Sequence, residues 1–220
     1  MADGKRGPYA KGKARRKQIL DAALTIIAVE GFDHATLSKI SKAVGITDVA
    51  VLHYFDSMDD LMVEVLKQRD ANDVIAATTP LSDFASQITK LAKDPENAIK
   101  QILAITARNM KTPGLVELYA HMSVRASNPK NPAYKYFKFR GMIERNLVGR
   151  AVTNLIKKKK LHTDIPAEDM ARIAQAIFDG LQIQWLLDRD IDMPHLAEEA
   201  INLLQAGASQ PIKRHTKKST

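Results

Sequence analysis

The 220-residue sequence contains no cysteine, one tryptophan and only 5% aromatic residues. Without cysteine the chain forms no disulfide, no thiolate metal site and no cysteine nucleophile. Long apolar runs are also missing, because the longest near-apolar stretch, Ala22 to Val29, is far shorter than the roughly 20 residues that span a bilayer. The basic start has no apolar run behind it, so no signal peptide is predicted. We expect a cytoplasmic protein with no membrane partner.

The residue patterns of common enzyme sites are absent as well. The six histidines are scattered, with no pair four residues apart and no His-Glu motif of the metal-site type. No glycine-rich phosphate loop occurs. We therefore predict that the protein is not an enzyme and that it holds no metal and no cofactor.

The composition is that of a globular protein, with 45% hydrophobic and 26% charged residues. A chain of this length can bury a sizeable core, in one large domain or two small ones. Apolar residues recur at helical spacing, and neither strand-like alternation nor an internal repeat is found. The sequence predicts an all-α fold of about nine helices.

The net charge of +8 is concentrated at the two ends of the chain. Residues 1–17 hold seven basic residues and one acidic residue, which gives 7 − 1 = +6, and residues 207–220 hold four basic residues, which gives +4. The remaining 8 − 6 − 4 = −2 belongs to the body of the chain. We predict a disordered basic arm at 1–12 and a disordered basic tail at 207–220. Such segments suit a polyanion, although basic ends also occur as solubilising extensions.

Two short helical patterns follow one another between Thr36 and Phe55. Thr36 stands at an N-cap position and Gly45 at the position where a chain leaves a helix in left-handed conformation. The apolar positions of this first helix are Leu37, Ile40, Ala43 and Val44. Thr47 offers a second N-cap, and the apolar positions of the next helix are Val49, Val51, Leu52 and Phe55. Two short helices joined by a tight turn predict a helix-turn-helix, whose second helix reads the DNA major groove.

Residues 13–66 resemble the tetracycline-repressor (TetR) family in the order and spacing of their motifs. The matching residues are Gly31-Phe32, Thr36-Leu37 with Ile40, Gly45-Ile46-Thr47, His53-Tyr54-Phe55, Ser57 and Leu61. A weaker likeness to one subset of the family continues in segments 112–118 and 179–187. The resemblance implies a homodimeric repressor that binds a pseudo-palindromic double-stranded DNA operator and is released by a small-molecule effector.

The sequence departs from this family at the expected phosphate contacts. Leu52 and Met58 stand where many relatives carry Tyr and Lys, and Asp48 and Asp56 add negative charge nearby. Two alternatives therefore stay open. One is a helical binding or scaffold protein with a weakened DNA surface, and the other is a TetR-type activator.

The predicted domain organisation follows from caps and prolines. A helix-turn-helix domain at 13–57, whose first helix starts near Lys13, is followed by a connecting helix at 58–77. A larger helical domain for ligand binding and dimerisation covers 78–206. Its predicted helices lie near 95–111, 113–125, 132–157, 166–190 and 194–206, and the first three have Asp94, Thr112 and Asn131 as caps before a proline.

Candidate site residues follow from this organisation. Those expected to contact DNA are Lys13, Arg15, Arg16, Thr36, Ser38, Lys39, Thr47, Asp48, Ala50, His53 and Tyr54. Asp48 has the chemistry to accept a hydrogen bond from a cytosine amino group. Those expected to line an effector pocket are Met110, Leu118, His121, Met122, Arg125, Tyr134, Phe137, Phe178 and Gln182.

A dimer interface is expected on the last two helices, because the helix near 166–190 is apolar nearly all round and needs cover on more than one side. The alternative is that this helix is simply internal to one chain. The interface candidates are Ile173, Ile177, Leu181, Trp185, Leu196, Ala200, Leu203 and Leu204.

Overall fold

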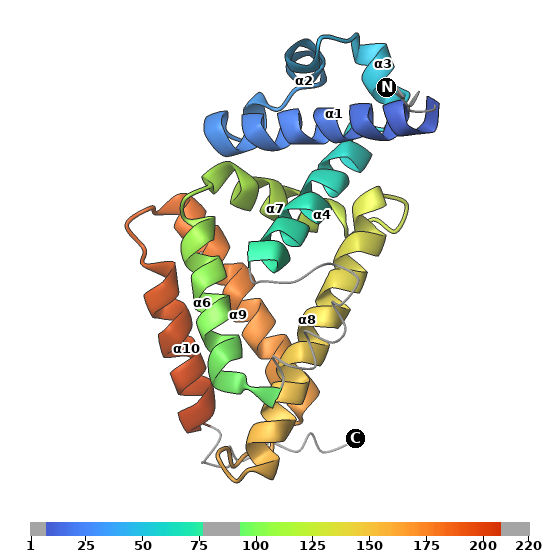
Figure 1. Cartoon of the computed structure of the whole chain (residues 1–220). Helices are drawn as coiled ribbons and strands as arrows, with labels where there is room; N and C mark the ends of the chain where they lie inside the picture. Colours follow the sequence, from blue (N-terminus) through green and yellow to red (C-terminus); the bar gives the residue numbers. More distant parts are fainter. Residues whose placement is uncertain (1–7, 77–92, 208–220) are drawn as a thin grey trace, which may run out of the picture. The chain divides into compact units, whose positions relative to one another are not determined.

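The computed structural model of the chain describes residues 8–76 and 93–207 (Figure 1). These residues form helices joined by short turns, and no strand occurs among them. The predicted arm at 1–12 lies mostly outside the described residues, and the tail predicted at 207–220 lies almost wholly outside them. The predicted all-α fold class is confirmed.

The first five elements are α1 (Pro8–Glu30), the short 3₁₀ helix η1 (Phe32–His34), α2 (Leu37–Val44), α3 (Asp48–Leu52) and α4 (Met58–Ala76). The next five are α6 (Pro95–Asn109), α7 (Pro113–Arg125), α8 (Pro132–Lys157), α9 (Ala167–Leu187) and α10 (Met193–Gly207).

Most helix boundaries agree with the sequence, because prolines and polar caps mark them. α7 and α8 span the predicted ranges, and the Asp94 and Asn131 side chains accept hydrogen bonds from backbone N–H groups at the starts of α6 and α8. Thr112, in contrast, makes no side-chain cap. The predicted start of the first helix at Lys13 is wrong. α1 begins at Pro8, because proline fits the first turn of a helix and one internal glycine, Gly12, costs only about 1 kcal/mol.

The described helices divide into two compact units. The first comprises 8–76 with 107–140, and the second comprises 93–106 with 141–207. This division differs from the predicted boundary near residue 78. α7 and the first turns of α8 pack with the helix-turn-helix and belong to the first unit.

The first unit has one continuous apolar core formed by α1, α2, α3, α4 and α7. Its fully buried members include Ile19, Ile27, Ile40, Val51, Phe55, Leu61, Leu66, Leu118 and Met122. α1 contacts α2, α4 and α7, and α2 in turn contacts α3, so the two short helices are held on α1 through α2 (Figure 1).

The contact between α7 and α1 depends on Gly114, the second residue of α7. A Cβ atom at this position would lie 2.1 Å from the backbone oxygen of Ile27 and 2.9 Å from the Cα atom of Gly31. Only glycine therefore allows the start of α7 to approach the end of α1 this closely.

In the second unit α9 and α10 pack side by side (Figure 1). A small apolar cluster joins Val152, Leu161 and Met170, with Leu204 of α10 packed against it. Trp185 is 3% exposed, and the Arg189 guanidinium lies 4.1 Å from the centre of its ring.

Candidate nucleic-acid interface

The turn between α2 and α3 has the geometry that its sequence predicts. The Thr36 hydroxyl oxygen accepts a hydrogen bond from the N–H of Lys39 at 3.3 Å, and the Thr47 hydroxyl oxygen accepts one from the N–H of Ala50 at 3.1 Å. Gly45 adopts the left-handed conformation, with φ 71° and ψ 40°. The Ile46 N–H then reaches back to the Ser41 carbonyl at 3.0 Å, which closes the end of α2.

One side of α3 holds the helix against the core of the first unit. Val51 is fully buried, and Phe55, just beyond the helix, is 2% exposed. The other side faces solvent and carries Val49, which is 66% exposed, and Leu52, which is 44% exposed. Of the four apolar positions predicted for this segment, only Val51 and Phe55 therefore belong to the core. In a helix of five residues the apolar positions are too few to fix which face is buried.

Three of the basic side chains predicted to contact DNA form ion pairs or hydrogen bonds with other residues of the first unit. Arg16 forms an ion pair with Glu64 at 3.0 Å, and its guanidinium lies 4.6 Å from the centre of the Phe55 ring. Arg15 donates to the Val44 carbonyl at the end of α2, and Lys39 pairs with Glu30 at the end of α1. These side chains hold α1 against α2 and α4, so their structural role competes with phosphate binding.

The remaining candidates in the helix-turn-helix keep polar atoms near solvent. Lys13, Thr36, Ser38, Thr47 and His53 are exposed, while Asp48, Ala50 and Tyr54 are half-buried. Lys42 at the end of α2 is also exposed, although it was not among the predicted contacts.

Asp48 has a partner inside the turn as well. The Ser41 hydroxyl donates to its Oδ1 atom. This bond ties the start of α3 to the buried side of α2 and orients the carboxylate.

The start of α4 is held by local capping hydrogen bonds and by side chains from the α7–α8 turn. The Ser57 hydroxyl accepts from the Asp60 N–H at 3.1 Å, and the Asp60 carboxylate accepts from the Asp56 N–H at 3.2 Å, which is a reciprocal cap. Asp59 accepts from Arg125 Nε at 2.9 Å and from Asn131 Nδ2 at 2.6 Å. The α7–α8 turn is thereby tied to the first turn of α4.

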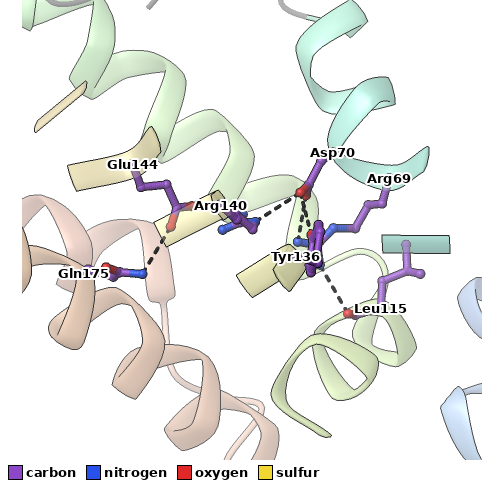
Figure 2. A network of polar contacts seen from close by, with 7 residues as sticks. All are labelled: Arg69, Asp70, Leu115, Tyr136, Arg140, Glu144 and Gln175. Atoms are coloured by element: carbon purple, nitrogen blue, oxygen red, sulfur yellow. Dashed lines mark hydrogen bonds and ion pairs between the residues drawn. The ribbon is translucent and has the colours of Figure 1, made fainter. Parts of the chain in front are cut away.

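A second polar cluster joins the far part of α4 to α7 and α8 (Figure 2). Asp70 accepts from the Tyr136 hydroxyl at 2.6 Å and from Arg140 Nε at 3.1 Å. Arg69, which is 7% exposed, donates to the Leu115 carbonyl at 3.3 Å. Burial raises the pKa of Tyr136 above its ordinary value of 10, and the neighbouring Asp70 adds to the rise, so the phenol stays protonated and donates.

The predicted effector-pocket residues are divided between the two units. Leu118 and Met122 are buried in the core of the first unit, and Arg125 is held by Asp59. Phe137 packs on Tyr119 and Tyr136, while His121 stacks on Phe32. Phe178 and Gln182 belong to α9 in the second unit, where both are half-buried. Met110 and Tyr134 are half-buried and belong to the first unit.

In the second unit the predicted interface residues differ in how much of each side chain is exposed to solvent. Leu181 and Trp185 are 9% and 3% exposed, so they offer little surface to a partner chain, and their place in an interface stays a prediction. Ile173, Leu196 and Leu203 are exposed, and Ile177, Ala200 and Leu204 are half-buried. Ile183 and Leu187, which were not among the candidates, are 46% and 85% exposed.

The exposed apolar residues of α9 and α10 follow helical stripes. Ile173, Gly180 and Leu187 recur every seven residues along α9, and Leu196 and Leu203 do so along α10. This seven-residue spacing is the signal that identifies Ile173 and Leu187 as one face of the helix.

Among the described residues no group of three potential metal-binding side chains comes together. Within the same part of the chain, no helix is both long and apolar enough to cross a membrane.

Comparison with known proteins shows which family the helix-turn-helix resembles. Residues 19–65 match the family model described as bacterial regulatory proteins, tetR family. The matched range runs from the middle of α1 through η1, α2 and α3 into the first turns of α4. Residues 19–65 therefore form a helix-turn-helix region of the TetR family.

Curated relatives extend the likeness beyond this range. The HTH-type transcriptional regulator PksA of Bacillus subtilis is 28% identical over 176 residues, which cover 79% of this chain and 80% of PksA. The fatty acid metabolism regulator protein of the same organism is 29% identical over 75 residues, and the match spans only 39% of that protein. Both relatives are named as regulators.

A solved structure of a TetR-family repressor has a similar helical fold. Thermus thermophilus FadR, a TetR-family transcriptional repressor in complex with lauroyl-CoA, aligns with a TM-score of 0.61 over 93% of this chain and all of that one. The two sequences are 16% identical, so this likeness shows the fold alone.

Proposed function

We propose that the protein is a homodimeric, sequence-specific repressor of transcription that a small-molecule effector releases from its operator. The observation that carries this proposal is the outward face of α3, which is held clear of the core by Val51 and Phe55 and framed by capped turns. The DNA-contacting set is Lys13, Thr36, Ser38, Thr47, Asp48, Ala50, His53 and Tyr54, and we add Lys42, Val49 and Leu52 to it.

Dimerisation is proposed through the exposed stripes of α9 and α10. Leu187 and Leu203 are 85% and 69% exposed in the single chain, which is costly for large apolar side chains in water. Gly180 has no atom within 4 Å of an added Cβ, so a partner helix has room to approach closely there. A second copy of α9 and α10 would cover both stripes in a four-helix arrangement.

The effector is proposed to bind in the second unit, where Phe178 and Gln182 supply one aromatic and one polar group. Binding would favour a spacing of the two α3 helices that no longer matches the half-sites, as a shift between two populations. Acyl-CoA thioesters are the first effectors to test, because T. thermophilus FadR holds lauroyl-CoA and a curated relative regulates fatty acid metabolism. Such a ligand should lower operator affinity.

Selection of binding sites from a random DNA library tests the central part of the proposal. Two recognition helices in successive major grooves require inverted half-sites about 10 base pairs apart, centre to centre. Enrichment of such a site would support the proposal. Recovery of no preferred sequence, or of a single half-site without symmetry, would contradict it.

Sedimentation of the Leu187→Glu variant tests the interface. A carboxylate on the α9 stripe should shift the dimer towards monomer and reduce operator affinity, because the two half-sites are no longer linked. Val124→Glu on α7 is the matched control, since Val124 is 73% exposed in the other unit. A Leu187→Glu variant that sediments as a dimer would place the interface elsewhere.

A further inference from the structure

The outward face of α3 is unusual for a surface that reads DNA, because two of its positions lack any hydrogen-bonding group. Val49 and Leu52 lie one helical turn apart and are 66% and 44% exposed. His53, which directly follows Leu52, supplies an imidazole next to this apolar pair. Core packing does not explain Val49 and Leu52, since Val51 and Phe55 fill the buried side.

In the major groove the C5-methyl group of thymine is the one alkyl group on a base edge. The nitrogen and oxygen groups of the four base pairs are hydrogen-bond donors or acceptors, which an aliphatic side chain would leave without a partner. Placing Val49 against a cytosine amino group or a guanine oxygen would therefore weaken binding.

We propose that Val49, with Leu52 beside it, specifies thymine in each half-site by contact with the C5-methyl group. This inference rests on the proposed function, because it assumes that α3 enters the major groove. Val49 is the second residue of α3, and the first residues of a recognition helix are those that meet base edges. Shape complementarity at this position would compensate for the base-edge hydrogen bonds that Val49 and Leu52 cannot make.

The size of the effect follows from the area of one methyl group. Removing a buried methyl contact should weaken binding about fourfold, and a symmetric change in both half-sites should weaken it roughly sixteenfold. Hydrogen bonding to the remaining base edges would be unchanged.

The test replaces thymine by deoxyuridine, one symmetric pair of positions at a time, in the site selected from the random library. Uracil keeps every hydrogen-bonding group of thymine and lacks only the methyl group. We expect wild-type protein to lose about sixteenfold in affinity at one symmetric pair of positions, or at two adjacent pairs, by fluorescence anisotropy. When cytosine replaces thymine at that position, the protein should bind the duplex with 5-methylcytosine more tightly than the duplex with unmodified cytosine.

Val49→Ala identifies the side chain responsible. The variant should bind the thymine site more weakly than wild type and should no longer distinguish thymine from uracil at the position that Val49 reads. Leu52→Ala is measured in the same way. Val124→Ala removes the same atoms from an exposed valine on α7 and should leave both affinities unchanged. Thermal unfolding verifies that the variants fold, which the exposure of Val49 favours.

The outcomes separate this inference from the proposed function. A selected operator that binds equally well with thymine or uracil at every position overturns the inference and leaves the repressor proposal standing. Full DNA affinity of Val49→Ala also overturns it, and would mark the apolar face as a docking site for a protein. Absence of any selected sequence would overturn both.

Discussion

Glu64 illustrates how single charged side chains of the first unit stabilise the fold. Its carboxylate pairs with Arg16 of α1 at 3.0 Å and with Lys67 of its own helix at 2.6 Å. Burial acts to raise the pKa of Glu64, but the hydrogen bonds from Lys67 and Arg16 outweigh it and hold the pKa below its ordinary value of 4.5. The ionised carboxylate therefore stabilises the folded chain.

The pH dependence of this contribution can be measured. Because the folded pKa is the lower one, the stabilisation is present above about pH 4.5 and is lost as the pH falls through the folded value. Glu64→Gln should reduce the free energy of unfolding by about 1 kcal/mol at pH 7 and by less at pH 3.5, in urea titrations. Glu168→Gln is the control, since its pair with Arg172 is exposed and should contribute little at either pH. A Glu64→Gln deficit that is equal at both pH values would contradict this account.

At the scale of the helices, the predicted helix ends agree with the structure where residues close in sequence determine them. Thr36, Thr47 and Gly45 satisfy backbone groups within a few residues of themselves, so their roles are readable from the sequence. The prolines at the starts of α6, α7 and α8 act in the same local way.

Features that depend on contacts distant in sequence were not predictable. The burial of Trp185 depends on packing within the second unit, and the exposure of Val49 depends on which side of a five-residue helix meets α1 and α4. The grouping of α7 with the helix-turn-helix depends on the contact between Gly114 and Ile27, which no periodicity reveals. The candidate pocket divides between two units for the same reason.

Gly114 gives a direct test of the packing between α1 and α7. Gly114→Ala should reduce the free energy of unfolding by about 2–3 kcal/mol, because a methyl group would overlap a backbone oxygen that can move only with its helix. Gly12→Ala is the matched control, since nothing lies within 4 Å of an added Cβ on α1, and it should be neutral or stabilising by up to about 1 kcal/mol. Equal effects of the two substitutions in urea titrations would show that α7 does not pack this closely.

At the scale of the whole molecule, the distribution of charge sets how DNA binding responds to salt. Arg15, Arg16 and Lys39 are engaged in contacts of the first unit, so phosphate binding needs further cations. The N-terminal segment 1–7, which lies outside the described residues, supplies Lys5 and Arg6. We therefore keep the proposal that the arm contacts phosphates, and place its border at the start of α1.

Deletion of residues 1–7 tests the arm. Each phosphate contact contributes about −0.9 to the slope of log K against log salt, so loss of two contacts per subunit would flatten the slope by up to about 3.6. Sequence preference should survive, since phosphate contacts position the protein and base contacts specify the site. An unchanged slope in anisotropy titrations would assign the phosphate contacts to Lys13, Lys42 and Tyr54 instead.

The ratio of affinities for the selected operator and for a scrambled duplex of the same composition tests the central claim most directly. Fluorescence anisotropy at about 150 mM salt measures both affinities on the same protein sample. A dimer that reads DNA with two copies of α3 should prefer the operator by roughly 10³-fold or more. The preference should fall by at least tenfold in His53→Ala or Val49→Ala, while Val124→Ala keeps it. A ratio near one for the wild-type protein would contradict the assignment of α3 as a reading helix.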